Sequence, residues 1–318
     1  MAQQRLRRSV LACPGSSEKM MGKAAASTAD EVFLDLEDAC APLEKPAARG
    51  RIVEALTTHD WSGKVRVVRI NQVTSRYAFR DILEVVGGAG AHLDCIMVPK
   101  CQNAGDVAFV DRALTQLEQD LDLPLGRIGI EAQVEDALGL ENAYAIATAS
   151  PRVETLIFGP ADFSAAMQLP SLSVAGGSPD YPGDVFHYVL FRLAVAARAA
   201  GVQVIDGPFL AIKDVEGYGV SARKAAALGY DGKWVLHPGQ LDACNAAFTP
   251  TQAQFDRSVA ILEAYRIATE VDRKGAVMMG DEMIDEASRK MATQFHARGL
   301  AAGLQPSAPV GDGVAAGG

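Results

Sequence analysis

The sequence has no apolar run of the roughly 18 residues that a membrane-spanning helix needs. It is also short of positive charge, because 30 lysines and arginines stand against 39 aspartates and glutamates, a net charge of −9 over 318 residues. Such an acidic chain argues against a nucleic acid or an anionic membrane as partner. The apolar stretch after Arg8, residues 10–12, is too short for a signal peptide. We therefore expect a cytoplasmic protein.

Cysteine is scarce, and the sequence motifs of several enzyme classes are missing. The five cysteines are odd in number and none forms a CxxC pair, so we expect buried free thiols and no zinc site. There is no glycine-rich phosphate loop of the P-loop or dinucleotide type, and no G-x-S-x-G turn. The nearest approach is Pro14-Gly15-Ser16-Ser17, which could bind an anion at a helix N-terminus.

The sequence does contain a regular alternation of short apolar runs and longer amphipathic patterns. The runs are near-continuously apolar, as in parallel strands buried on both faces. They cover residues 9–13, 32–36, 65–70, 95–98, 128–134, 155–158, 202–205 and 233–236. The helical patterns cover residues 18–26, 45–57, 76–86, 104–121, 136–148, 186–200 and 212–228. Eight βα units predict an α/β fold, the (β/α)8 TIM barrel.

A doubly wound open sheet is the structural alternative, and the placement of polar residues argues against it. In a barrel, polar residues that follow the strands converge on one mouth, whereas an open sheet uses only the few at its switch point. Here such residues follow nearly every strand: Asp35, Glu37, Asp38, Arg69, Asn71, Lys100, Glu135, Asp162, Asp206 and His237.

The strand repeat ends near residue 250. Residues 1–249 are predicted to form the barrel, and residues 250–300 a helical lid. The lid contains two helical patterns, residues 252–270 and 281–298, joined by apolar residues 275–280. Residues 301–318 are rich in Gly, Ala and Pro and are predicted to be disordered. The polar loop at residues 168–183 suits an active-site cover.

Glu135 and Asp162 each follow an apolar strand in consecutive units, so their carboxylates can meet at the barrel mouth. Two hard oxygen ligands with open water positions suit Mg²⁺, or Mn²⁺, and leave room for substrate oxygens. The structural alternative, which spacing alone favours, is that each acid caps a helix.

Three acids, Asp35, Glu37 and Asp38, crowd the end of the second strand, and their mutual repulsion requires a cation nearby. Arg69, which ends the third strand, is the nearest candidate. It could clamp a substrate carboxylate, pair with Glu37 only, or do both. Lys100 suggests Schiff-base chemistry, but nearby acids would raise its pKa and favour charge pairing. 

His237, after the eighth strand, is a possible base, although a capping role fits its strand-to-helix turn better. 

Several stretches of the sequence are informative when they are taken together: RSVLACPGSSEKMMGKA, VFLDLEDACAPLEKPAAR, VRVVRIN, CIMVPK, QVEDALGLENA, FGPADFSA, GYDGKWVLHPGQLDACNAAFTP and EMIDEAS. They resemble the citrate-lyase β-subunit-like part of the HpcH/HpaI aldolase superfamily, which contains Mg²⁺-dependent carbon–carbon lyases acting on acyl-CoA thioesters. The resemblance spans about residues 8–301. IDGPFLAIKD and the segment ending in DVFHYVLFRLAVAARAAG look most like the malyl-CoA and β-methylmalyl-CoA lyase branch, with citramalyl-CoA lyases as close neighbours.

The resemblance implies a role for several of these polar residues. Glu135, in QVEDALG, and Asp162, in FGPAD, match the metal-binding acids of the family. Arg69, in VRIN, matches the arginine that holds the carboxylate of the 2-oxo acid. Glu37 and Asp38, in DLED, match acids that support the metal's water ligands and that arginine.

Asp285, in EMID, matches the catalytic carboxylate, which in the family a lid delivers from a neighbouring subunit. This implies a homotrimer or homohexamer. Where the family often reads D-G-K-M-I-D, this chain has G-D-E-M-I-D at residues 280–285, which keeps the catalytic position but alters the lid near CoA. Arg8, Pro14 and Lys19 are the candidate CoA contacts.

The implied reaction is cleavage of malyl-CoA, β-methylmalyl-CoA or citramalyl-CoA to a 2-oxo acid, glyoxylate or pyruvate, and acetyl-CoA or propionyl-CoA. The reaction is reversible by Claisen-type condensation. Three alternatives stay open: a malyl-CoA thioesterase, a citrate lyase β-subunit-like chain that acts on an acyl-carrier protein, and a non-catalytic binding protein. The last would not need Glu135, Asp162 and Asp285 together.

Overall fold

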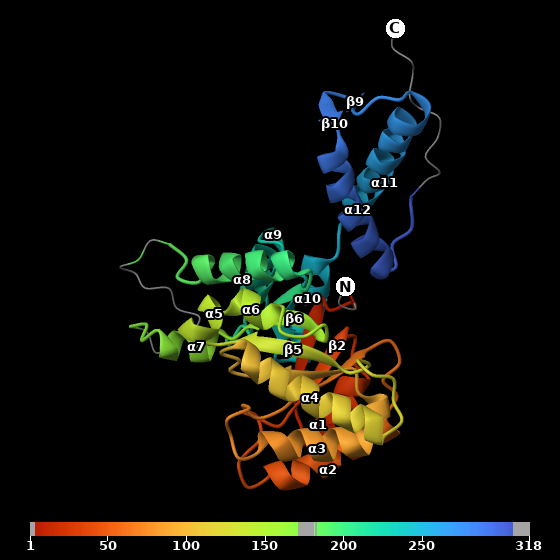
Figure 1. Cartoon of the computed structure of the whole chain (residues 1–318). Coiled ribbons are helices and arrows are strands. Elements are labelled where there is room, and N and C mark those ends of the chain that lie inside the picture. The colour runs from red at the N-terminus through yellow and green to blue at the C-terminus, as the bar shows by residue number, and fades with distance from the viewer. Residues whose placement is uncertain (1–3, 171–180, 182, 308–318) are drawn as a thin grey trace. The chain divides into compact units, whose positions relative to one another are not determined.

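The structure is a computed structural model that describes residues 4–170, 181 and 183–307. The chain divides into two compact units between Phe248 and Thr249, whose elements are drawn in Figure 1. None of the helices within the described ranges is long and apolar enough to cross a membrane.

The first unit is built on eight parallel strands that close into a barrel in chain order. This confirms the predicted (β/α)8 fold, and each strand lies within two residues of its predicted run, because a strand buried on both faces is a continuous apolar run. The strands are β1 Ser9–Pro14, β2 Glu31–Asp35, β3 Val65–Arg69, β4 Cys95–Val98, β5 Gly129–Val134, β6 Val153–Phe158, β7 Gln203–Asp206 and β8 Gly232–Val235.

Helices follow the strands and cover the outside of the barrel (Figure 1). They are α1 Glu18–Ala25, α2 Lys45–Thr58, α3 Ala78–Ala89, α4 Ala104–Asp120, α5 Ala137–Glu141, α6 Ala143–Ala147, α7 Pro160–Ala166, α8 His187–Ala200, α9 Val215–Ala227 and α10 Leu241–Phe248, with short 3-10 helices η1 Gly90–His92 and η2 Pro238–Gln240. The single helix predicted at residues 136–148 is wrong, because the chain leaves α-helical geometry at Asn142 (φ −93°, ψ 6°) and forms two helices. Helices α7 and α10 were not predicted.

Alternate strand residues point into the barrel and fill it in layers. The middle layer is apolar, and the rings of Phe33 and Trp234 pack there with centroids 4.4 Å apart. Its other members include Val10, Val67, Met97, Ile157 and Ile205. Polar residues lie at both ends of this layer: one set at the carboxyl ends of the strands, which form the mouth, and one at their amino ends.

The lower layer, at the amino ends of the strands, gathers three glutamates around Arg7. The buried guanidinium lies 2.7 Å from Glu31, 3.0 Å from Glu131 and 2.5 Å from Glu154. Burial, together with repulsion from Glu31 and Glu154, raises the pKa of Glu131 well above its ordinary value. Arg5 also binds Glu154 at 3.0 Å, so this layer holds three carboxylates against two guanidinium groups.

The second unit contains α11 Gln252–Arg266, a π-helical turn η3 Ile267–Val271, an antiparallel hairpin of β9 Val277–Met279 and β10 Glu282–Ile284, and α12 Glu286–Ala301. The helix predicted at residues 281–298 is therefore wrong at its start. Gly280 adopts a φ of +64°, which turns the chain and lets residues 282–284 pair with β9. Helices α11 and α12 pack side by side (Figure 1), with Phe255 stacked on His296.

The prediction of disorder from residue 301 is wrong for residues 302–307. The Leu304 N–H donates to the Gly299 carbonyl at 2.9 Å, and the Ser307 N–H donates to Asp256 Oδ1 at 3.1 Å. Residues 308–318 lie outside the described residues, as do residues 171–180 and 182 of the loop predicted to cover the active site.

Candidate active site

Arg69 and Asp35 end the neighbouring strands β3 and β2 and are paired in register at the mouth. Arg69 donates from Nε to Asp35 Oδ1 at 2.8 Å and from Nη2 to Asp35 Oδ2 at 2.6 Å. Burial favours a higher pKa for Asp35, but Arg69 and the backbone N–H groups of Glu37 and Ala39 hold the pKa below its ordinary value. Arg69 is thus the cation that the sequence predicted beside these crowded acids. Asp35 accepts from two of its three guanidinium nitrogens.

The third nitrogen of Arg69 remains for another partner. Nη1 lies 3.2 Å from Glu37 Oε2, an oxygen that makes no hydrogen bond of its own. The guanidinium is nearly buried and lies over the rings of Phe33 and Trp234, 5.5 and 5.3 Å from their centroids. These contacts fix its plane, and Nη1 is the nitrogen that Asp35 does not engage.

Glu135 follows β5 directly, and its carboxylate is buried at the mouth. Glu135 Oε1 accepts the Lys100 N–H at 3.0 Å. A Cβ at Gly159 would lie 2.5 Å from Glu135 Oε2, so only glycine leaves room for the carboxylate there. Burial raises the pKa of Glu135 to about 8, a value that applies without a bound cation.

Lys100 brings the remaining acids together. Its ammonium nitrogen lies 2.5 Å from Glu37 Oε1, 3.4 Å from Asp38 Oδ2 and 3.7 Å from Asp162 Oδ1. Although burial opposes it, this carboxylate environment raises the pKa of Lys100. The amine is therefore a poor Schiff-base nucleophile, as the sequence predicted.

Asp162 lies in the first turn of α7, on the unit after Glu135, and is partly exposed. Lys100 links the two carboxylates, because its backbone N–H donates to Glu135 at 3.0 Å and its ammonium lies 3.7 Å from Asp162. The structure thus brings together Arg69, Glu37, Asp38, Glu135 and Asp162, which the sequence placed at one mouth.

This group suits a divalent cation that keeps part of its water shell. Within the described ranges, no cluster of three or more His, Cys, Asp and Glu side chains is arranged to hold a metal ion. Glu135 and Asp162 would supply two hard oxygen ligands, with water and substrate oxygens completing the shell. Mg²⁺ is commonly held by one or two carboxylates in this way.

A buried network behind the mouth positions the loop that carries Glu37, and sequence reasoning missed it. The Lys45 ammonium donates to the carbonyls of Leu36 and Glu37, at 2.6 and 2.7 Å, and to Asn71 Oδ1 at 2.6 Å. Asp81 in turn accepts from both nitrogens of Asn71. The available signal was a lysine, Lys45, at the start of a helix, where cations are disfavoured.

Two of the three predicted CoA contacts lie at the mouth end of the barrel, and the third does not. Pro14 ends β1, and Lys19 is exposed in the first turn of α1. Arg8 precedes β1 at the amino ends of the strands, where its guanidinium binds Asp30 at 2.7 and 2.8 Å. Arg8 thus lies at the other end of β1 from Pro14, and the assignment of Arg8, Pro14 and Lys19 to CoA stays a prediction.

Asp285 is the N-cap of α12 in the second unit. Its Oδ1 accepts the Ser288 N–H at 3.0 Å and the Ser288 hydroxyl at 3.2 Å. The Ser288 backbone N–H is the main cause that lowers the pKa of this partly exposed carboxyl. His237 is likewise a cap, since its Nδ1 accepts the Gly239 N–H at 3.1 Å.

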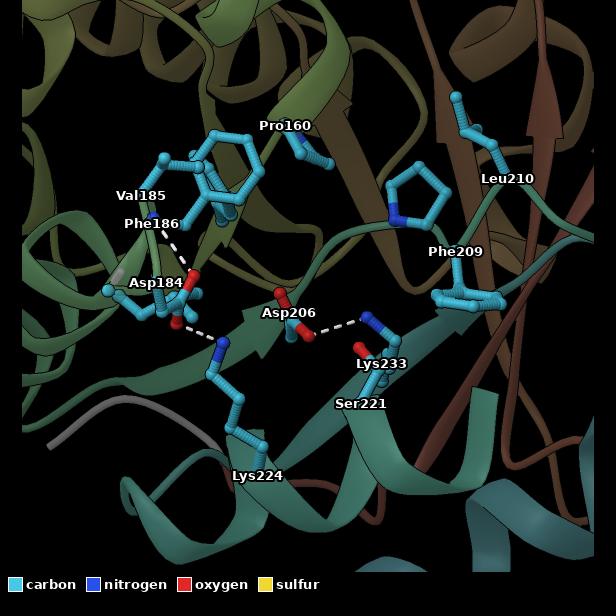
Figure 2. Close-up of a pocket in the computed structure, with 14 residues that line it drawn as sticks. Pro160, Asp184, Val185, Phe186, Asp206, Phe209, Leu210, Ser221, Lys224 and Lys233 are labelled. Atoms are coloured by element: carbon cyan, nitrogen blue, oxygen red, sulfur yellow. Dashed lines mark hydrogen bonds and ion pairs between the residues drawn. The ribbon is translucent and has the colours of Figure 1, made fainter. Parts of the chain in front are cut away.

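Asp206 was expected at the mouth and lies elsewhere. It alternates with the inward-facing Ile205 and pairs with Lys233 at 2.5 Å on the outer side of the barrel wall. Figure 2 shows this pair in a pocket of about 190 Å³ between the strands and helices α8 and α9, with Lys224 bound to Asp184 at its rim. Glu135, Asp162 and Arg69 do not line this pocket.

Comparison with known protein families identifies the family of this chain. The sequence model of the HpcH/HpaI aldolase/citrate lyase family matches residues 8–238. The chain belongs to this family.

Two curated relatives and one solved structure show how similar this chain is to other proteins. The L-malyl-CoA/β-methylmalyl-CoA lyase of Cereibacter sphaeroides is 36% identical over 291 residues, 88% of this chain and 90% of that protein. The citrate lyase subunit beta of Leuconostoc mesenteroides subsp. cremoris is 31% identical over 90% of each chain. The crystal structure of protein CitE from Mycobacterium tuberculosis, in complex with magnesium, acetoacetate and coenzyme A, has a TM-score of 0.72 and 30% identity over 93% of this chain and 98% of that one.

Family membership confirms the resemblance on which the residue roles were predicted. It does not test those roles one by one, so the assignments of Glu135, Asp162, Arg69 and Asp285 remain predictions. 

Proposed function

We propose that this protein is a Mg²⁺-dependent carbon–carbon lyase that cleaves a 3-hydroxyacyl-CoA to a 2-oxo acid and an acyl-CoA. The candidate substrates are malyl-CoA, β-methylmalyl-CoA and citramalyl-CoA, with glyoxylate or pyruvate and acetyl-CoA or propionyl-CoA as products. The convergence of Glu135, Asp162 and Arg69 Nη1, which Asp35 leaves to Glu37, at one mouth carries the proposal. The names of the malyl-CoA lyase relatives support it.

Each side chain at the mouth has a part in this proposal. Glu135 and Asp162 would hold Mg²⁺, or Mn²⁺, which supplies Lewis acidity to the substrate oxygen that becomes the ketone. Arg69 binds the carboxylate of the 2-oxo acid through Nη1, while Asp35 keeps the guanidinium in its plane. Glu37 and Asp38, held by Lys100, accept hydrogen bonds from water in the site.

Asp285 is the proposed proton-transfer residue. In cleavage the substrate hydroxyl loses its proton to water in the site as the carbon–carbon bond breaks, and the protonated carboxyl of Asp285 gives a proton to the carbon of the departing thioester fragment. In condensation the carboxylate takes a proton from that carbon, and water returns one to the new hydroxyl. As a helix cap with a lowered pKa, Asp285 is a weak base. Closure of the second unit as a lid over a barrel of a neighbouring subunit, in a trimer or hexamer, would exclude water and raise its pKa.

The direct test is to incubate purified protein with Mg²⁺ and a panel of 3-hydroxyacyl-CoA esters and identify both products. We expect a 2-oxo acid together with acetyl-CoA or propionyl-CoA. Free malate and CoA would instead indicate the thioesterase. Turnover only on an acyl-carrier protein would favour the citrate lyase subunit.

Metal dependence separates this mechanism from Schiff-base chemistry. EDTA should abolish cleavage, and added Mg²⁺ or Mn²⁺ should restore it. Full activity in EDTA, with borohydride trapping the substrate on Lys100, would contradict the metal mechanism.

A further inference from the structure

Lys100 is held at the mouth by its backbone as well as by its side chain. It follows β4 with a φ of +49°, a left-handed conformation that is uncommon for a residue with a Cβ. Such strain persists where surrounding contacts fix it. Here the backbone N–H is fixed on Glu135 at 3.0 Å, and the ammonium on Glu37 at 2.5 Å.

The two attachments place one cation inside the whole acidic group. The ammonium is 3.4 Å from Asp38 and 3.7 Å from Asp162, and the side chain is 24% exposed. Arg69 is largely committed to Asp35. Arg69 Nη1 shares Glu37 with Lys100 at 3.2 Å, and Lys100 is the cation that also lies beside Asp38 and Asp162.

We propose that Lys100 is a built-in counter-cation of the metal site: it keeps the acids assembled without the metal and competes with the metal for them. This inference rests on the proposed function, because it takes Glu135 and Asp162 as the metal ligands. Lys100 is a positioning residue, and its effect reaches the reaction through the carboxylates. A second cation entering the group meets its repulsion, which in partly buried surroundings is stronger than in water.

The inference predicts that removing the charge tightens metal binding. In Lys100→Gln, we expect the Kd for Mn²⁺, measured by titration calorimetry or by the EPR signal of free Mn²⁺, to fall about tenfold, which corresponds to about 1.4 kcal/mol. Lys100→Arg keeps the charge and should bind Mn²⁺ like the wild type. Lys23→Gln, an exposed charge loss in the last turn of α1, is the matched control and should change nothing.

A second measurement tests the other half of the proposal. Without metal, the acids of Lys100→Gln repel one another unopposed, so its thermal unfolding midpoint should lie below that of the wild type. Mn²⁺ should raise that midpoint more in Lys100→Gln than in the wild type. Lys100→Arg should follow the wild type in both conditions.

The possible results distinguish failure of the proposed metal site from failure of the role given to Lys100. Wild-type protein that binds Mn²⁺ no better than Glu135→Gln would contradict the proposed metal site itself. Wild-type binding that Glu135→Gln abolishes, with unchanged or weaker binding in Lys100→Gln, would leave the metal site standing and overturn the role given to Lys100.

Discussion

At the scale of single residues, Arg69 and Asp35 act as one planar unit. Two nitrogens of the arginine are engaged by one carboxylate, and the rings of Phe33 and Trp234 support its face. The sequence predicted a two-point clamp on substrate, but that geometry is used on Asp35. Only Nη1 can then bind the substrate carboxylate, and the two hydrogen bonds to Asp35 set the direction of Nη1.

Arg69→Lys should therefore weaken binding of the 2-oxo acid, although the charge is kept. An ammonium cannot hold Asp35 at two points and also reach the substrate. We expect the KM for the 2-oxo acid in condensation to rise about 10- to 100-fold, as loss of a charged hydrogen bond implies, with little change for acetyl-CoA. Arg66→Lys is the control, because Arg66 lies on the same strand and binds Asp94 at 2.8 Å. Equal losses for both substrates would instead point to general damage.

At the scale of elements, the turn from β6 to α7 shapes the site as much as the acids do. Gly159 has a φ of −107°, so it is not required for an unusual backbone conformation. It is required because any Cβ would meet the Glu135 carboxylate. The helix that follows brings Asp162 to the same place.

Gly159→Ala should displace Glu135 and weaken Mn²⁺ binding at least about tenfold, since overpacking of this kind costs about 1–3 kcal/mol. Gly50→Ala is the control: it lies in α2 with nothing within 4 Å of the added Cβ. That variant should gain about 0.5–1 kcal/mol of stability and bind Mn²⁺ normally. Calorimetric titration of both proteins measures this difference, and equal Mn²⁺ affinities would contradict it.

The elements also show what a single sequence can predict. Buried parallel strands are apolar throughout, so all eight could be located, and their polar ends placed Glu37, Arg69, Glu135 and Asp162 correctly. Side-chain direction at a strand end was not predictable, so Asp206 was placed at the mouth although it faces the outer wall. The hairpin at residues 277–284 was missed because three-residue strands carry too little periodicity.

At the scale of the whole barrel, the lower polar layer makes stability depend on pH. The pKa of Glu131 is raised in the folded protein by burial and by Glu31 and Glu154, so the folded state keeps a proton that the unfolded chain releases. A group of this kind stabilises the fold fully below its unfolded pKa of about 4.3, and that stability is lost as pH rises towards the folded pKa. Arg7, together with Arg5 on Glu154, limits the loss, but two guanidinium groups do not balance three carboxylates.

Glu131→Gln should remove this loss, because an amide has the same shape and no proton to release. As pH rises from about 5 to 8, we expect the thermal unfolding midpoint of Glu131→Gln to increase relative to that of the wild type. Glu84→Gln, at a partly exposed glutamate of α3, controls for the change in net charge. Thermal unfolding at several pH values is the measurement, and parallel pH profiles for Glu131→Gln and wild type would contradict the assignment.

The last prediction concerns the subunit whose active site Asp285 serves. It lies in the second unit, and we predict that it serves the barrel of a neighbouring subunit in a symmetric homo-oligomer. Asp285→Asn should keep the cap on α12, because Asn caps as well as Asp, yet lose cleavage. Glu135→Gln should lose metal binding and cleavage.

When these two inactive proteins are mixed and exchange subunits, some sites combine an intact barrel with an intact Asp285 from the neighbour. Random assembly makes these roughly a quarter of all sites, so activity should recover towards that fraction. If Asp285 served its own barrel, every site would still carry one lesion and the mixture would stay inactive. Native mass spectrometry must show mixed oligomers alongside the assay, and confirmed exchange without activity would rule out sites shared between subunits.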